Sequence, residues 1–137
     1  MNATMLATTY TTPLTFYTRK QALELGSLKD ISRFTCSFDL KFPTAMTDAA
    51  WRYLIDNDDY GNQRQIEFKL RELCFMLSSA FFTKVLETTQ VFYFPFRVDS
   101  GKNHISATLK VVISSRDNLQ PVMTVMLPDE EARYIIW

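Results

Sequence analysis

The sequence is poor in the residues from which common catalytic and ligand sites are built. It holds one histidine, two cysteines and three glycines in 137 residues. A single histidine rules out a two-histidine metal set in one chain and leaves one candidate base for a nucleophile. The glycines are all expected at turns, so no glycine-rich phosphate loop is present. We therefore expect no catalytic residues, no metal and no cofactor, and interpret the chain as a protein that is not an enzyme.

Net charge and long apolar runs are missing as well. Fifteen basic residues balance fifteen acidic ones, which argues against nucleic acid as the primary partner because no excess positive charge is available to neutralise phosphates. No apolar run approaches the ~18 residues of a membrane span. Residues 1–12 carry no charge, unlike the basic start of a secretory signal. We expect a cytoplasmic protein without membrane contact.

The two cysteines, Cys36 and Cys74, are too few for a disulfide framework. Both lie in apolar patterns and are predicted to be buried thiols. Cys36, Cys74 and the lone His104 have no ligand-like spacing, and His104 borders a predicted hairpin turn. Two core thiols and one surface histidine are the favoured interpretation over a Cys-His site.

What the sequence does contain is apolar surface: 47% of the residues are hydrophobic, and eleven are Phe. That content predicts one compact domain over residues 13–131. Residues 1–12 are interpreted as a frayed terminus or a short edge strand, and residues 132–137 as an apolar tail.

Hydrophobic periodicity predicts an α+β fold. The expected helices cover residues 19–25, ending at Gly26, then 47–55, capped by Thr47 or Thr44, and 63–86. The expected strands cover residues 33–42, 91–98, 104–114 and 122–127. Pro95 removes a ladder donor, so the strand at 91–98 is predicted to lie at an edge or to carry a bulge. We expect an antiparallel sheet of about four strands, with one long helix and one or two short helices packed on it.

The long helix carries a second apolar stripe besides its core stripe. Phe68, Phe75, Phe82 and Leu86 lie about 120–160° around the helix from Leu70. Two interpretations stay open. Either another element, the 47–55 helix or the C-terminal tail, covers this stripe, or it is a protein interface. The apolar residues of the tail, among them Tyr134 and Trp137, are assigned to the same interface, which also predicts a homodimer as one form of the protein.

A further site hypothesis concerns calcium. Residues 56–67 resemble a calcium loop, with Asp56, Asp58, Gly61 and Glu67 in ligand or turn positions, but Tyr60 and Gln63 break the pattern. A solvated turn that caps the following helix is favoured instead.

A nucleic-acid site would combine a basic cluster with exposed residues of the 91–98 strand. Its members are Arg19, Lys20, Lys29, Arg33, Tyr93 and Arg97. The alternative is that Phe92, Phe94 and Phe96 are core, with Tyr93 and Arg97 alone exposed.

Three blocks of the sequence carry a family resemblance. They are Tyr17-Thr18-Arg19-Lys20-Gln21-Ala22-Leu23 with Gly26 and Leu28-Lys29-Asp30-Ile31-Ser32; Phe42-Pro43-Thr44-Ala45-Met46-Thr47 with Trp51; and Leu109-Lys110 with Pro121-Val122-Met123-Thr124-Val125-Met126-Leu127-Pro128-Asp129. Together they resemble a family of small uncharacterised bacterial proteins, named as a domain of unknown function and associated with plasmids and phages. The resemblance implies a mobile genetic element as the source and brings no catalytic residues with it.

These observations favour a protein-interaction module of a mobile element. We expect a small inhibitor that binds a host or anti-phage defence protein, as anti-CRISPR proteins do. The alternative is a nucleic-acid-binding accessory factor in plasmid or phage maintenance.

Overall fold

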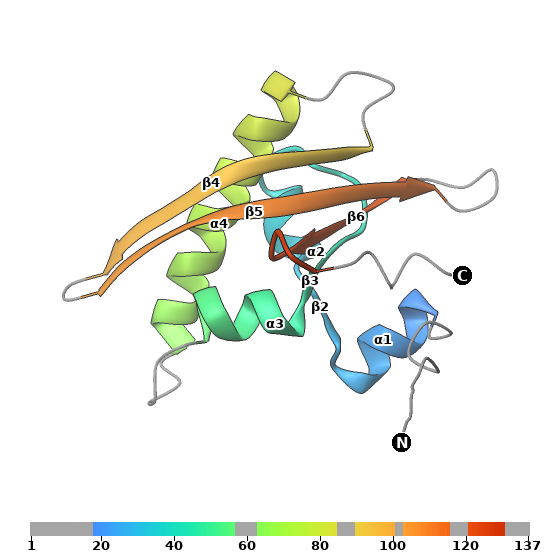
Figure 1. The fold of residues 1–137 in the computed structure, drawn as a ribbon, viewed down its shortest axis with the longest axis horizontal. Helices are drawn as coiled ribbons and strands as arrows, with labels where there is room; N and C mark the ends of the chain where they lie inside the picture. The colour runs from blue at the N-terminus through green and yellow to red at the C-terminus, as the bar shows by residue number, and fades with distance from the viewer. Residues whose placement is uncertain (1–17, 57–62, 85–89, 101–102, 116–120, 131–137) are drawn as a thin grey trace.

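The computed structural model describes residues 18–56, 63–84, 90–100, 103–115 and 121–130. These residues form an α+β fold, which confirms the predicted class (Figure 1). The elements in chain order are α1 (Arg19–Leu25), β2 (Leu28–Asp30), α2 (Ser32–Cys36), β3 (Thr44–Thr47), α3 (Asp48–Ala50), η2 (Trp51–Ile55), α4 (Gln63–Lys84), β4 (Val91–Ser100), β5 (Asn103–Ser115) and β6 (Pro121–Met126). None of the helices in this described part of the chain combines the length and apolar character needed to cross a membrane.

The five strands form one mixed sheet in the order β2-β3-β6-β5-β4. β3 and β6 pair in parallel, whereas the other three neighbouring pairs are antiparallel. The sheet is therefore larger than the predicted four antiparallel strands. β4 lies at one edge, as Pro95 predicted, and the β4–β5 hairpin crosses α4 in Figure 1.

The main core lies between α4 and one face of the sheet. Leu73 and Leu77 of α4 are fully buried in one cluster with Phe94 and Phe96 of β4 and Leu109 of β5. The alternating burial along β4 follows from the pleat, because every second side chain points to the same face. This confirms that Phe92, Phe94 and Phe96 are core residues.

The central strands β3 and β6 are covered on both faces. Met46 of β3 belongs to the main core, whereas its neighbour Ala45 packs in a second cluster with Ala22 of α1 and Leu28 of β2. All four residues of β3 are buried. A strand buried on both faces shows no apolar–polar alternation, and this is why β3 was not predicted.

The predicted helix boundaries are confirmed where capping residues mark them. Thr18 begins α1 with a capping box shared with Gln21, and Gly26 ends it in the left-handed conformation at a φ of 84°. Thr47 caps α3 by accepting a hydrogen bond from Ala50 N–H. The predicted 47–55 helix continues as the π-helical turn η2, in which Asp56 N–H donates to the carbonyl of Trp51, five residues back.

The predicted strand at residues 33–42 is wrong. Residues 32–36 form α2, whose first turn is stabilised by Asp30 Oδ1 accepting from Ser32 N–H at 2.9 Å. The chain then turns at Asp39, which has a φ of 67°. Phe34 and Phe38 stand four residues apart, so the alternating pattern is equally compatible with one face of a helical turn. Phe34 of α2 and Phe38 in the turn after it both pack against the main core.

Arg19 ties α1 to the sheet. Its guanidinium is buried and donates to Thr124 Oγ1 at 2.6 Å and to the Met123 carbonyl at 2.7 Å. Burial lowers the pKa of Arg19 to about 10, against a smaller opposing effect of Asp30. The charge is thus retained at neutral pH, and its hydrogen bonds offset its removal from water.

Replacing Arg19 by Met is expected to lower the free energy of unfolding by about 1–3 kcal/mol, because two buried acceptors on β6 lose their donor. The exposed neighbour Lys20 provides the control, since Lys20→Met should change stability by less than about 0.5 kcal/mol. Urea denaturation followed by tryptophan fluorescence measures both. Equal effects of the two variants would contradict the role given to Arg19.

Candidate interaction surface

α4 exposes three phenylalanines along one side. Phe68, Phe75 and Phe82 are 47%, 53% and 62% exposed, whereas Leu70, Leu73 and Leu77 on the other side are buried. The three rings recur every seven residues, about 10.5 Å apart along the axis. We call this set the α4 aromatic face. Its exposure within the described residues agrees with the predicted second stripe, while the predicted interface residues Leu86, Tyr134 and Trp137 lie outside the described residues.

A groove borders the α4 aromatic face on the side of β4. It has a volume of about 510 Å³, and its apolar lining comes from both elements: Phe75, Met76, Ala80, Phe94 and Pro95. Lys84 and Arg97 are the ionisable residues of its lining. We call it the α4–β4 groove, and its composition suits an apolar side chain with a neighbouring carboxylate.

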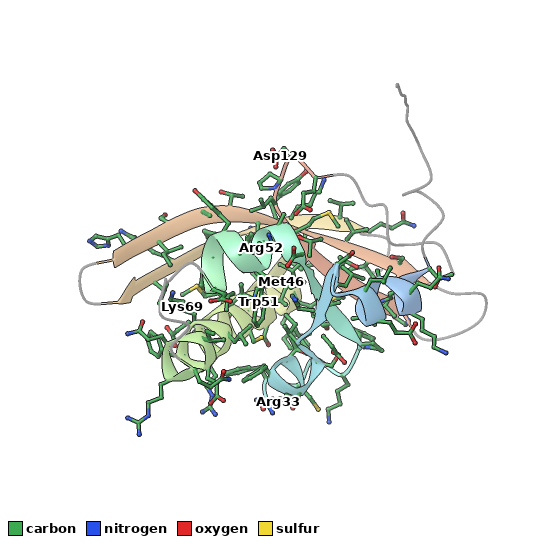
Figure 2. The ribbon with its side chains drawn as sticks, turned by 90° about the horizontal axis from the view of Figure 1, so that it is seen from below. Arg33, Met46, Trp51, Arg52, Lys69 and Asp129 are labelled. Atoms are coloured by element: carbon green, nitrogen blue, oxygen red, sulfur yellow. The ribbon has the colours of Figure 1, made fainter. Side chains whose placement is uncertain are left out.

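A second groove, the α2–α4 groove, lies on the opposite side of the same face. It has a volume of about 350 Å³ and is lined by Arg33, Phe34, Ser37, Phe38 and Arg71. Phe38 meets Phe75 edge to face at 5.9 Å between ring centroids, so this ring pair connects the two grooves. Figure 2 shows α2, with Arg33, on the side of the molecule away from the sheet.

The aromatic rings at the end of α4 support one another. Phe81 lies against Phe82 at 5.2 Å and also contacts Phe42 and Phe92 at 5.7 and 6.4 Å. Phe92 is a core residue of β4. The exposed ring of Phe82 therefore rests on side chains that are anchored in the core, which gives the face a fixed shape.

The free edge of β4 is partly closed. The Gln90 carbonyl accepts a hydrogen bond from Ile113 N–H of β5. In an antiparallel pair, successive residues direct their backbone groups alternately to the two sides, so the even-numbered residues of β4 form hydrogen bonds with β5. The backbone groups of the odd-numbered residues Tyr93 and Pro95 therefore face the open edge. At this edge, Lys84 Nζ donates to the Tyr93 carbonyl at 2.8 Å. Pro95 has no N–H to offer. Lysine and proline at these positions hinder the addition of another strand.

A polar pocket lies elsewhere, where α1, β2, β3 and α3 meet. Asp48 in its lining pairs with Lys29 at 3.9 Å and with Arg52 at 3.0 Å. Glu130 Oε2 accepts from Thr47 Oγ1 and from Leu127 N–H. Glu130 is half-buried, and its two hydrogen bonds link the end of β6 to Thr47 of β3.

The proposed nucleic-acid residues do not gather in one patch. Arg19 is buried. Lys29, on the edge strand β2, is paired with Asp48 of α3. Tyr93 and Arg97 are exposed on β4, which is the opposite edge of the five-stranded sheet. Four strand spacings separate the two edges by about 19 Å. Lys20 is exposed on α1, and Arg33 lines the α2–α4 groove.

The two thiols differ, and one prediction about them is wrong. Cys74 is buried in the core as predicted, but Cys36 at the end of α2 is exposed because residues 33–42 are not a strand. Burial raises the pKa of the Cys74 thiol to about 12, which keeps it protonated and unreactive at neutral pH. His104 lies at the tip of the β4–β5 hairpin, opposite Asp99 in the ladder.

The calcium hypothesis falls mainly on residues that are not described, since Asp58 and Gly61 belong to the segment 57–62. Within the described ranges, no group of three or more His, Cys, Asp or Glu side chains is placed to hold a metal ion.

The chain matches no family model, no curated protein and no solved structure. The resemblance to mobile-element proteins stays a prediction. Its three blocks fold into α1 with β2, β3 with the first residue of η2, and β5 with β6. The blocks contain none of the three phenylalanines of the α4 aromatic face, although Phe42 contacts Phe81 beside Phe82.

The difference between the thiols predicts their labelling. Native protein should react with one equivalent of a thiol reagent, at Cys36, and denatured protein with two. The pKa of Cys74 is higher in the folded chain than in the unfolded chain. The protonated thiol therefore contributes to the free energy of unfolding below pH 9.0, and this contribution is lost between about pH 9 and 12. Mass spectrometry of labelled peptides from pH 7 to 9 checks the assignment, and native labelling of Cys74 at pH 7 would contradict it.

Proposed function

We propose that this chain is a protein-interaction module that binds its partner through the α4 aromatic face. The observation that carries the proposal is the exposure of Phe68, Phe75 and Phe82 along one side of a helix whose other side is fully used by the core. Contiguous aromatic surface of this kind marks protein interfaces, because its burial against a partner releases ordered water.

The surroundings of the three rings support this proposal. Grooves of about 510 and 350 Å³ lie on the two sides of Phe75, so a partner finds recesses as well as protruding rings. Phenylalanine and arginine are both enriched at interfaces, and Arg71 is exposed beside the rings. Rings held in place by core contacts lose little conformational entropy on binding.

The partner that we propose is a host or anti-phage defence protein, which the chain inhibits by covering a functional surface. The resemblance to small proteins of plasmids and phages supports this class of partner. The alternative, a nucleic-acid-binding accessory factor, has less support. Lys29 lies at one edge of the sheet and Tyr93 and Arg97 at the other, and the buried Arg19 is hydrogen-bonded to β6.

A photo-cross-linking amino acid at position 75 tests the proposed surface. In a lysate of the bacterium that carries the gene, it should form a discrete adduct with one host protein. The control is the same amino acid at position 53, since Tyr53 is similarly exposed, at 61%, but lies on η2 outside both grooves.

A second substitution, Phe82→Glu, placed in the chain that carries the cross-linker at position 75, should abolish the adduct, because a charge replaces part of the apolar contact. Identical adducts from positions 53 and 75, or an adduct that survives Phe82→Glu, would refute the proposed surface.

A further inference from the structure

We infer that the α4 aromatic face recognises an acidic amphipathic protein segment, whose apolar side chains enter the α4–β4 groove and whose carboxylates meet the cations around it. This inference rests on the proposed function and specifies the chemistry of the partner.

The ionisable residues that line the two grooves are all cationic. Arg33 and Arg71 line one groove, and Lys84 and Arg97 line the other, while neither lining contains a carboxylate. Glu67 is outside both linings and approaches Arg33 at 3.9 Å. The whole chain has no net charge, so this local excess of cations is a property of the surface. A partner that complements it carries negative charge.

The cations also have apolar neighbours. The Arg33 guanidinium stacks over the Phe34 ring at 4.6 Å, and Lys84 lines the α4–β4 groove together with the apolar residues Phe75 and Ala80. A ligand must therefore present apolar groups and carboxylates close together. An amphipathic segment does this when carboxylates flank an apolar stripe.

The segment is recognised through its side chains rather than by strand addition. A strand added to β4 would have to bond with the outward-facing groups of Tyr93 and Pro95. The Tyr93 carbonyl is already an acceptor for Lys84, and Pro95 supplies no donor. These two positions break the ladder in the middle of the edge. A helical segment keeps its backbone bonds internal and needs no such ladder.

A second copy of the chain fits this surface less well. In a symmetric dimer the same patch meets itself, so the arginines and lysine around Phe75 would face those of the other copy. Like charges at an interface are unfavourable. The surface thus favours a different, acidic partner over a homodimer.

Selection from a random display library of helical peptides about 12 residues long, three turns of helix, tests the inference with purified protein. We expect the selected peptides to combine Glu or Asp with Leu, Ile or Phe. Their affinity should fall about tenfold in Arg71→Glu, and it should also fall as salt is raised.

The matched control is Lys20→Glu, which makes the same change in net charge on α1 and should leave the affinity unchanged. Thermal melting verifies that both variants are folded. Because Arg71 is exposed and lies outside the core, its variant should melt with the wild type.

Each other outcome overturns the inference. Peptides enriched in Lys or Arg, peptides without charge, or affinities that Arg71→Glu and Lys20→Glu reduce equally would do so. A dimeric mass by light scattering that Phe75→Glu converts to a monomeric mass would assign the face to a second copy, and retention of single-stranded DNA lost in Arg71→Glu would assign it to nucleic acid.

Failure here is distinguishable from failure of the proposed function. A position-75 adduct with a host protein, together with selected peptides that are not acidic, would refute the acidic partner alone. The absence of both would refute the interaction surface itself.

Discussion

The parallel pairing of β3 with β6 is the contact on which the rest of the fold depends. It joins the N-terminal strands β2 and β3 to the C-terminal meander of β4, β5 and β6. A parallel pair needs a long crossover, and here the crossover contains α4 and the β4–β5 hairpin. Three hydrogen bonds reinforce the junction. Arg19 donates two to β6, and Thr47 at the end of β3 donates one to Glu130, which follows β6.

The same junction explains what the resemblance blocks describe. Thr18 and Gln21 form the capping box of α1, Arg19 bonds to Thr124, and Thr47 caps α3. Each of these motif residues has a structural partner, and Arg19 has its partner in another block. The blocks therefore specify how α1, β3 and β6 assemble. The α4 aromatic face is built from the intervening sequence, so the motifs carry no information about what that face binds.

The elements predicted correctly are those whose patterns admit one physical explanation. β4 and β5 alternate over many residues, and α4 carries an apolar stripe over 22 residues. Short elements are different. Phe34, Phe38 and Phe42 alternate with polar neighbours as in a strand, but they are also four residues apart. The hydrogen bond from Ser32 N–H to Asp30 and the turn at Asp39 favour the short helix that the structure shows. β3 is buried on both faces and has no period to detect.

The candidate site was predictable only in part, for a related reason. The seven-residue spacing of Phe68, Phe75 and Phe82 is a local property, so the exposed stripe can be read from the sequence. The grooves are not local. One needs Phe94 and Pro95 of β4 beside α4, and the other needs Phe38, which the predicted strand at 33–42 placed in the sheet. The cationic character of the two groove linings likewise arises when four cations from three elements come together.

The position of Lys84 shows how an exposed apolar surface and an edge strand coexist in one molecule. An open edge beside phenylalanine rings would invite pairing with any extended chain. Lys84, from the last turn of α4, reaches across to the Tyr93 carbonyl, and Pro95 interrupts the donors two residues later. Pairing through backbone hydrogen bonds, which does not depend on the side chains of the added strand, is thereby hindered. The rings and the grooves stay accessible. What remains available for recognition is side-chain shape and charge, and these discriminate between partners.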